Sequence, residues 1–380
     1  MSSGAYAKHS TVQPFLKELS SDLETLSNDR HVNVFYDPVR VKQINAESNA
    51  TANTSVYAPE FIERAKYENY MFRKVERLDG NLGYLKFNSF VDTGLSKSTL
   101  TAAMNFVANS AALIIDLRQN GGGDAKTCQL LLGYFLPDST VTSNRRSRNS
   151  NVVQPQYILR DPVVKKLNMP VYLLVSKRSS SAAEAFAYTL QAFKKATVIG
   201  DTTNGEANPG YLFALNQEMY IMIPAFENVN PVTHTNWQST GVIPDIKINA
   251  DKALTMAQAK AYETLSAVTR VKELKPMYEW LAQGFKAELS PSTYSPMQLQ
   301  AFSGEYANGR TITCENGVLY YERAGQGAGK KRLYPLTQNL FSLEGVPFFR
   351  VRFVPDDKGI ITALDGLYDD GQNERSAKIK

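Results

Sequence analysis

Two short and almost entirely apolar runs constrain the fold of this chain more than any other feature. They cover residues 112–117 and 171–175. A strand that is apolar at nearly every position must be buried on both faces, as it is in a parallel sheet covered by helices. Segments with apolar residues at helical spacing alternate with these runs. This alternation predicts an α/β core with a largely parallel sheet.

Shorter elements extend the pattern on either side. The dipeptide Asp79-Gly80 predicts a tight hairpin turn between two strands. Strands are expected over residues 32–36, 72–78, 83–87, 197–199 and 218–223, and helices over residues 12–28, 59–70, 96–109 and 251–285. The polar stretch 45–55 predicts a loop.

The last part of the chain differs in character from the core. After Pro291, short alternating runs are separated by turn dipeptides in which Asn, Lys or Asp precedes Gly. This pattern predicts an all-β module. We therefore expect an N-terminal helical segment (1–72), an α/β core (73–250), a helical connector (251–295) and a small β module (296–380).

Composition limits the function classes that need to be considered. The chain has 42 Lys and Arg against 37 Asp and Glu, a mild excess that does not argue for nucleic acid. The basic run at residues 145–148 is interpreted as a solvated loop. No apolar run reaches the ~18 residues of a membrane span, and the first residues show no signal peptide. The two cysteines form neither a disulfide framework nor a metal-ligand pattern.

Ser181 is the candidate nucleophile, because it stands where the second apolar strand turns into a helix. By default a serine at a helix N-terminus is an N-cap, and Ser179 and Ser180 could cap equally well. The same position also exposes the hydroxyl at the edge of the sheet, in front of helix amides that can receive an oxyanion. The small residues Ala182 and Ala183 let a substrate carbonyl approach the backbone.

A triple glycine follows the first apolar strand, at residues 121–123. Alone it indicates only a tight turn or a close approach of backbone. It is not a phosphate-binding loop, because the glycine spacing and the following Lys-Ser/Thr are missing. Together with Ser181, this turn can supply the second half of an oxyanion hole.

Five motifs in the right order resemble the tail-specific (C-terminal-processing) serine peptidases. They lie at residues 29–38, 116–123, 181–184, 198–205 and 230–245. The resemblance covers roughly residues 10–250 and implies a spiral β/α core related to the Clp protease and crotonase folds. The first and last motifs resemble the branch that contains interphotoreceptor retinoid-binding protein and the tricorn protease core.

The resemblance implies a role for each matched residue. It makes Ser181 the nucleophile and assigns the oxyanion hole to the amides of Gly123, or Gly122, and Ala182. It makes Arg118 and Glu184 supports of that site. The lysine that serves as base in one branch is replaced here by Glu206. In the tricorn-like branch the base is a histidine, and His31 falls on that position. Histidine suits the role because it titrates near neutral pH.

Gln238 departs from the tricorn-like pattern, which has a glutamate there. In a Ser-His-Asp triad, replacing the orienting carboxylate by its amide costs on the order of 10⁴ in rate. Glu206 is one candidate for the missing carboxylate, and His234 is one for an alternative base. From the residue pattern alone, His31 is a surface histidine, His234 is a loop residue, Glu206 is solvated or salt-bridged, and Trp237 is a packing residue.

Three functions follow from these observations. The leading one is a serine peptidase that acts on peptides or proteins without a metal or organic cofactor. The second is a catalytically weakened relative that binds an apolar ligand or a peptide, and the third is acyl-thioester chemistry of the crotonase type. The stretch between His31 and Arg73 is too short for a PDZ module. The family habit implies an extracytoplasmic location and leaves a homo-oligomer open.

Overall fold

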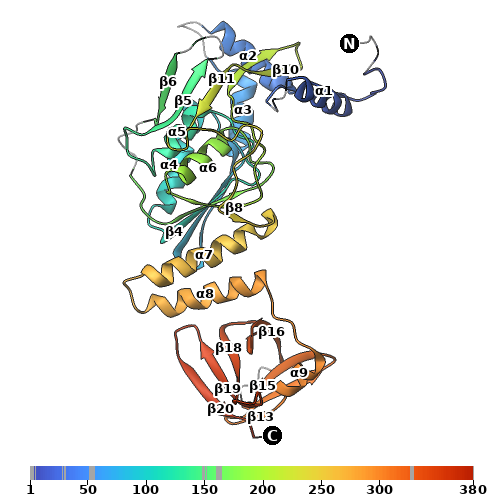
Figure 1. The fold of residues 1–380 in the computed structure, drawn as a ribbon, viewed down its shortest axis with the longest axis vertical. Coiled ribbons are helices and arrows are strands. Elements are labelled where there is room, and N and C mark those ends of the chain that lie inside the picture. Colours follow the sequence, from blue (N-terminus) through green and yellow to red (C-terminus); the bar gives the residue numbers. More distant parts are fainter. Residues whose placement is uncertain are drawn as a thin grey trace. The chain divides into compact units, whose positions relative to one another are not determined.

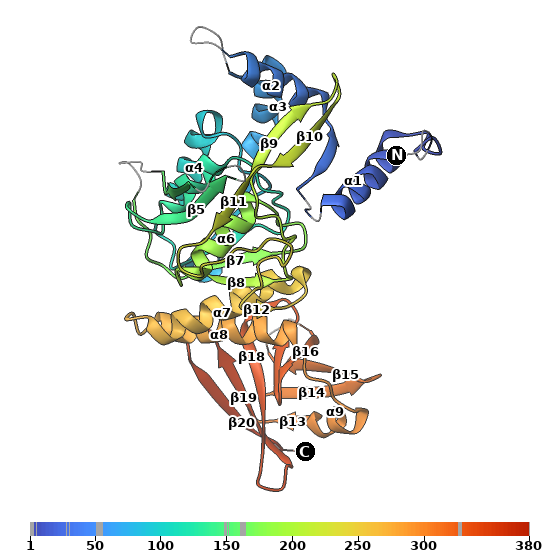
Figure 2. The same cartoon turned by 45° about the horizontal axis from the view of Figure 1, so that its top comes forward.

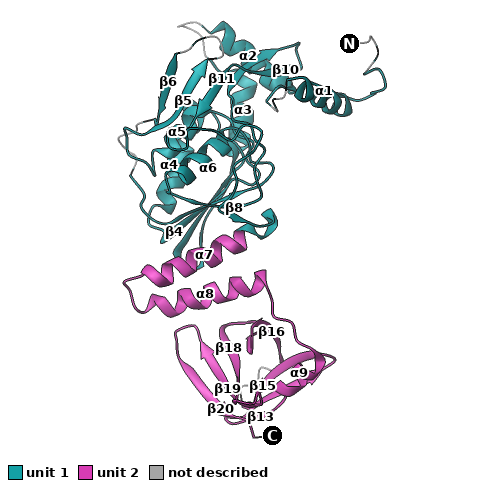
Figure 3. Ribbon diagram, viewed as in Figure 1, with its two compact units in different colours: residues 1–253 teal, residues 254–380 magenta. Residues whose placement is uncertain are grey.

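The computed structural model describes residues 4, 6–27, 29, 31–50, 56–147, 150, 152–159, 165–325 and 329–379. These residues form two compact units, Met1–Ala253 and Leu254–Lys380 (Figure 3). The finer four-part division expected from the sequence stays a prediction. Within the residues described, every helix is too short or too polar to cross a membrane.

A six-stranded sheet forms the centre of the first unit, with strand order β12-β8-β7-β4-β3-β2. Its strands are β2 (Phe72–Leu78), β3 (Leu82–Phe87), β4 (Ala112–Asp116), β7 (Val171–Val175), β8 (Thr197–Gly200) and β12 (Ile246–Lys247). The β2–β3 hairpin is antiparallel and every other neighbouring pair is parallel. Every residue of β4 and β7 is buried. The predicted α/β core with a largely parallel sheet is therefore confirmed.

Three helices lie next to this sheet, as Figure 1 shows: α4 (Thr93–Val107), α5 (Ala125–Leu132) and α6 (Ala182–Ala192). Asp92 and Asp124 cap α4 and α5 by accepting a hydrogen bond from the first-turn amides. The helices share one apolar core with the strands. Because β4 and β7 are parallel neighbours, the turns that follow them meet at one edge of the sheet. These turns carry the triple glycine and Ser181.

Two small antiparallel sheets complete the first unit. One has the order β1-β10-β9 and the other the order β11-β5-β6. Their strands are β1 (Asn33–Tyr36), β5 (Val141–Ser147), β6 (Val153–Tyr157), β9 (Gly210–Ala214), β10 (Met219–Pro224) and β11 (Phe226–Val229). Figure 2 shows β9 and β10 as a twisted hairpin. The predicted solvated loop at 145–148 was wrong for residues 145–147, which end β5; Arg148 lies outside the described residues.

The N-terminal helices are α1 (Val12–Ser27), α2 (Pro38–Asn49) and α3 (Pro59–Tyr67). Elsewhere in the chain, short 3-10 turns cover Asn69–Met71, Asp79–Asn81 and Ala250–Lys252. The loop expected over 45–55 was wrong for residues 45–49, which continue α2, while 51–55 lie outside the described residues. Pro38 at the first helical turn and the Asp37 cap start this helix early enough to include the polar stretch.

The second unit combines helices with one antiparallel sheet. Its helices are α7 (Ala253–Val268), α8 (Leu274–Leu289) and α9 (Pro296–Phe302). The single helix expected over 251–285 was wrong, because the chain breaks between α7 and α8. There the Thr269 hydroxyl accepts a hydrogen bond from the Val271 amide, a local turn that competes with helical pairing.

Eight strands follow in sequence order, so that each pairs with the next. They are β13 (Gly304–Tyr306), β14 (Arg310–Glu315), β15 (Val318–Arg323), β16 (Lys331–Thr337), β17 (Leu340–Leu343), β18 (Val346–Pro355), β19 (Ile361–Tyr368) and β20 (Asn373–Ala377). This unit has an aromatic-rich core of its own, in which Phe302 stacks on Phe353 with 4.4 Å between ring centroids. The predicted C-terminal β module is confirmed.

Candidate active site

Ser181 occupies a strained turn at the N-terminus of α6. Its φ is +51° and its ψ is −115°, a conformation that favours glycine. The turn lies against the glycine turn that follows β4, because a Cβ on Gly122 would lie 2.7 Å from the Ser181 Cβ. The side chain of Ser181 is only partly buried and lines a cavity of about 110 Å³. The serine thus faces open space in front of the helix amides.

The glycine turn presents one free amide to the same cavity. The Gly122 amide donates to Asn120 Oδ1 at 2.9 Å, so it is already engaged. Within the described parts of the chain, the amides of Gly123 and Ala182 donate no hydrogen bond, and both residues line the cavity with Ser181. Two free N–H groups beside a serine hydroxyl are the donors that an oxyanion hole requires. The geometry favours Gly123 over Gly122.

Asn120 fixes this arrangement from inside the protein. It is fully buried, and its side-chain amide donates to the Phe87 carbonyl at 3.1 Å. Its backbone carbonyl accepts a hydrogen bond from the Ser180 amide at 3.1 Å. The same residue therefore joins the glycine turn to the serine turn. The sequence showed Asn120 as part of a motif, but its bridging contacts depend on the fold.

Arg118 is not among the residues that line the cavity. Its guanidinium forms a two-pronged pair with Asp116, at 2.9 and 2.7 Å, and donates to the Ala250 carbonyl at 2.7 Å. Burial alone would raise the pKa of Asp116, but the hydrogen bonds from Arg118 and Tyr84 outweigh burial and hold the pKa below its ordinary value. The pair fixes the end of β4, from which the glycine turn starts.

Glu184 connects the start of α6 to the loop after β8. It is fully buried and accepts four hydrogen bonds, from the amides of Ser181, Gly205 and Glu206 and from the Thr203 hydroxyl. Burial raises the pKa of Glu184 to about 7, while these four donors act in the opposite direction. The carboxyl group thereby holds the backbone of Ser181 in its strained conformation.

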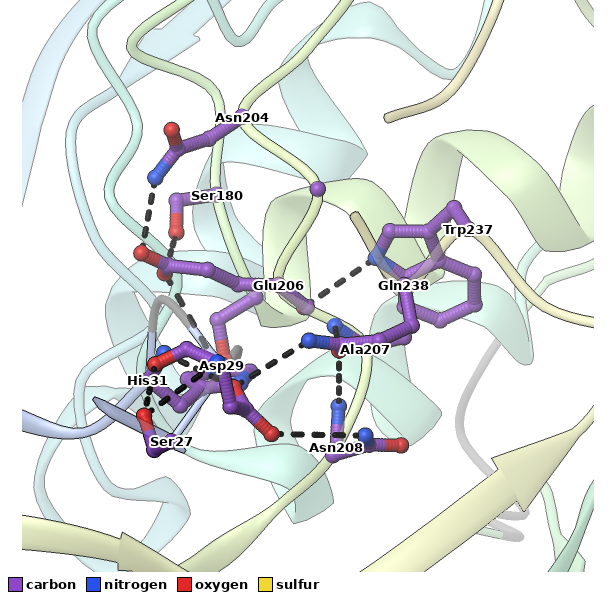
Figure 4. A network of polar contacts seen from close by, with 12 residues as sticks. Ser27, Asp29, His31, Ser180, Asn204, Glu206, Ala207, Asn208, Trp237 and Gln238 are labelled. Atoms are coloured by element: carbon purple, nitrogen blue, oxygen red, sulfur yellow. Dashed lines mark hydrogen bonds and ion pairs between the residues drawn. The ribbon is translucent and has the colours of Figure 1, made fainter. Parts of the chain in front are cut away.

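His31 is buried between two carboxylates, as Figure 4 shows. Its Nδ1 lies 3.8 Å from Asp29 Oδ1, and its Nε2 lies 3.9 Å from Glu206 Oε2. Within the described parts of the chain, neither ring nitrogen has a hydrogen-bond partner. Burial lowers the pKa of His31 to about 4, and the nearby Asp29 opposes the shift only in part. The imidazole is therefore neutral at physiological pH. It is buried rather than on the surface, and its pKa lies below the near-neutral range expected from the sequence.

Gln238 contacts Asp29 rather than His31 (Figure 4). Its Nε2 donates to Asp29 Oδ1 at 3.1 Å, and its Oε1 accepts hydrogen bonds from the amides of Ala207 and Asn208 at 2.8 and 3.2 Å. Asp29 Oδ1 also accepts from the His31 amide at 2.9 Å. Sequence reasoning assigned no role to Asp29, although its place two residues before His31 was a usable signal.

Glu206 lies on the opposite side of His31 from Asp29. It accepts hydrogen bonds from the Ser180 hydroxyl and, at 2.7 Å, from the side chain of Asn204. Trp237 donates from its ring nitrogen to the Glu206 carbonyl at 3.1 Å and packs against Tyr188. His234 lies in an exposed turn with φ of +58°. The structure thus brings Glu206 to His31 and leaves His234 on the surface.

Comparisons with known proteins give a consistent assignment. Residues 81–248 match the model of Peptidase family S41. The chain is 26% identical over 178 residues to the carboxy-terminal-processing protease of Bartonella bacilliformis, which covers 45% of this chain and 40% of that protein. It is 28% identical over 143 residues to the tail-specific protease of Haemophilus influenzae, which covers 37% and 20%. These matches confirm the resemblance to the tail-specific peptidases.

The chain spans less than half the length of these two relatives. Among solved structures, it is similar to a lipoprotein from Streptococcus agalactiae, with 13% identity, a TM-score of 0.47 and coverage of 68% of this chain and 84% of that one. It is also similar to the tricorn protease, with 16% identity, a TM-score of 0.33 and coverage of 52% and 18%.

Proposed function

We propose that this chain is a serine peptidase in which Ser181 attacks the carbonyl carbon of a peptide bond. One observation carries the proposal: the Ser181 side chain and the free amides of Gly123 and Ala182 line the same small cavity. A nucleophile beside two preorganised donors is the arrangement that acyl transfer needs. Its substrates are peptides or proteins, and an extracytoplasmic location follows from the resemblance.

His31 is the proposed general base. It takes the proton of the Ser181 hydroxyl as the oxygen bonds to the carbonyl carbon, and it later gives this proton to the leaving amine as the C–N bond breaks. Water then attacks the acyl ester on Ser181, and His31 again takes a proton and passes it to the leaving Ser181 oxygen. In the structure His31 Nε2 faces Glu206, so the proposed proton transfer requires Glu206 or the imidazole to move before Nε2 reaches the Ser181 hydroxyl. Such catalytic hydrogen bonds often form only in the substrate complex.

Asp29 supplies the carboxylate that Gln238 lacks. Its Oδ1 is on the Nδ1 side of the ring, which is where the orienting group of a triad stands. Gln238 then serves as a clamp, because its side-chain amide holds Asp29 while its oxygen is fixed by two backbone amides. Of the two rescues considered from the sequence, Glu206 lies on the other ring nitrogen and His234 lies in an exposed turn.

Labelling with a fluorophosphonate serine-hydrolase probe tests these roles. We expect Ser181→Ala to abolish labelling and His31→Ala to slow it by roughly 10²- to 10⁴-fold, the usual contribution of a general base. Asp29→Asn slows labelling as well, whereas His234→Ala leaves it unchanged. Ser180→Ala is the matched control for the neighbouring hydroxyl. Unchanged labelling of folded Ser181→Ala protein contradicts the proposal.

A second function has one observation in its favour. Both ring nitrogens of His31 lack hydrogen-bond partners among the described residues, and Gln238 stands where a glutamate is expected. A relative that binds an apolar ligand or a peptide without cleaving it would have such a site. If the probe leaves the folded wild-type protein unlabelled, this binding function replaces the peptidase.

A further inference from the structure

The cavity beside Ser181 has two chemically different walls. Residues of α5, α6 and the loops near them form a mostly apolar wall, in which the polar Gln129 and Thr189 stand beside Ala125, Cys128, Leu132, Ala185, Ala207 and Trp237. The sheet β11-β5-β6 contributes polar side chains, among them Ser143, Arg145, Gln156 and Asn228. The volume of about 110 Å³ is roughly that of three or four waters, so the cavity admits one short side chain or chain end.

The strand register explains why these polar groups gather. Arg145 pairs with Asn228 of β11, and Ser143 pairs with Gln156 of β6. Residues directly opposite one another in a sheet point to the same face, and residues two apart on one strand do so as well. All four side chains therefore share a face, while the neighbouring Arg146 belongs to the other face.

Arg145 is a half-buried cation without an ion pair among the described residues. Its Nε donates to Asn228 Oδ1 over a long 3.4 Å, and its guanidinium lies 5.3 Å from the centre of the Phe226 ring. Burial lowers the pKa of this guanidinium from its ordinary value. A partly desolvated charge without a counterion is costly, so such groups tend to be kept for ligands.

The other charge at the cavity does not neutralise Arg145. Among the described lining residues, Glu206 alone is acidic, and its carboxylate accepts hydrogen bonds from Ser180 and Asn204 near His31. A purely structural Arg145 would pack on Phe226 and donate to Asn228. That role uses the ring contact but leaves most of its five N–H donors, which suit a carboxylate, without a partner.

We propose that this cavity binds a carboxylate of the substrate residue next to the scissile bond, and that Arg145 is the residue that selects it. The carboxylate is an Asp or Glu side chain or a free chain terminus. The inference rests on the proposed function only for the position of the scissile bond. Recognition itself requires no cleavage, so it can be measured on protein without the nucleophile.

Binding to Ser181→Ala protein tests the inference. The probes are rhodamine-labelled alanine hexapeptides that carry Glu, Asp, Gln or Leu at the fourth position, each with an amidated and a free C-terminus, measured by fluorescence anisotropy at fixed ionic strength. We expect a carboxylate-bearing peptide to bind about 10- to 100-fold more tightly than the amidated Gln peptide, the range for a charge-assisted pair. Preference among amidated peptides identifies a side chain, and preference for free termini identifies a chain end.

The variant Arg145→Met, made in the Ser181→Ala background, should lose this preference. Arg146→Met is the matched control, since Arg146 is exposed on the same strand and lies 3.7 Å from Glu227. The inference is overturned if no peptide binds, if carboxylate and amide peptides bind alike, or if both arginine variants behave alike.

Probe labelling separates this inference from the proposed function. The fluorophosphonate has no carboxylate, so labelling of wild-type protein reports on Ser181 and not on carboxylate recognition. An unlabelled wild type beside Arg145-dependent peptide binding contradicts the peptidase and supports the carboxylate site. A labelled wild type that binds carboxylate and amide peptides equally tightly supports the peptidase and contradicts the carboxylate site.

Discussion

Glu184 has an unusual position for an acidic residue, since no part of it reaches solvent and each oxygen accepts two hydrogen bonds. Three of its four donors are backbone amides, which can donate but never accept. The side chain thus joins the Ser181 turn to residues 203–206 at the cost of burying a carboxyl group. Its contribution to the site lies in holding backbone, and its removal should affect stability and reactivity together.

The substitution Glu184→Gln changes one oxygen into an NH₂ group that faces backbone donors. We expect a loss of roughly 2–4 kcal/mol in the free energy of unfolding, because two buried amides lose their acceptor. Urea denaturation measures this loss, and probe labelling should slow in parallel. Glu63→Gln, on an exposed helix position, is the control. Equal free energies of unfolding for the two variants would contradict a stabilising role of the Glu184 hydrogen bonds.

His31 makes stability depend on pH. Its folded pKa of about 4 lies below the ordinary value of 6.5, so between these values the unfolded chain binds more protons than the folded one. The free energy of unfolding therefore falls as the pH drops from about 6.5 towards 4. The variant His31→Gln lacks this pH-dependent contribution to the free energy of unfolding. We expect the stability difference between wild type and variant to shift against wild type from pH 7.5 to pH 4.5, measured by denaturant unfolding; a constant difference contradicts the burial of a neutral imidazole.

At the scale of elements, the glycine turn between β4 and α5 carries the tightest constraint. Gly123 has φ of +127°, and a Cβ there would lie 2.2 Å from the Phe90 carbonyl oxygen. The Phe90 amide donates to Gly122, and the Asp124 amide donates to Phe90, so the turn is paired with the segment after β3. Backbone therefore occupies the space that a side chain would need.

Gly123→Ala should cost at least about 3 kcal/mol, because it combines a disfavoured φ with a clash against backbone that cannot rotate away. Gly121 offers a matched control in the same turn, since a Cβ there meets nothing within 4 Å. We expect Gly121→Ala to stay within about 1 kcal/mol of wild type. Thermal unfolding of both variants decides the matter, and similar melting temperatures would rule out the close approach.

The sequence predicted those elements whose pattern is local. The strands β4 and β7 are apolar throughout, and the turns after them carry Ser181 and the triple glycine, so the core and half of the site could be predicted. The polar strand β5 could not, because its partner β11 lies about 80 residues further along the chain. The Gln238–Asp29 contact joins residues 209 positions apart. Without that contact, Gln238 looked only like a lost catalytic group.

At the scale of the whole molecule, the two units have separate apolar cores. The core of the first contains the central sheet and α4–α6, and that of the second contains the aromatic residues of β13–β20 and α9. A unit with an apolar cluster of its own can lose stability by itself. The proposed chemistry at Ser181 depends on the first core, which contains Ala182 and Ala183.

The variant Phe353→Ala tests this independence. Phe353 is almost fully buried and stacks on Phe302, so its truncation should cost about 3–5 kcal/mol in the second unit. Phe348→Ala, about half exposed on the same strand, is the control. Calorimetry should show a lower unfolding temperature for the second unit, and probe labelling at 25 °C should stay unchanged. Loss of labelling with the folded first unit would show that the units act as one.

The backbone of Ser181 also has a conformational cost. At φ of +51° and ψ of −115°, glycine is less strained than any residue with a Cβ. The Ser181→Gly variant should therefore be more stable than Ser181→Ala. Serine is thus a strained residue for this backbone, which fits a role for its hydroxyl group in the proposed chemistry.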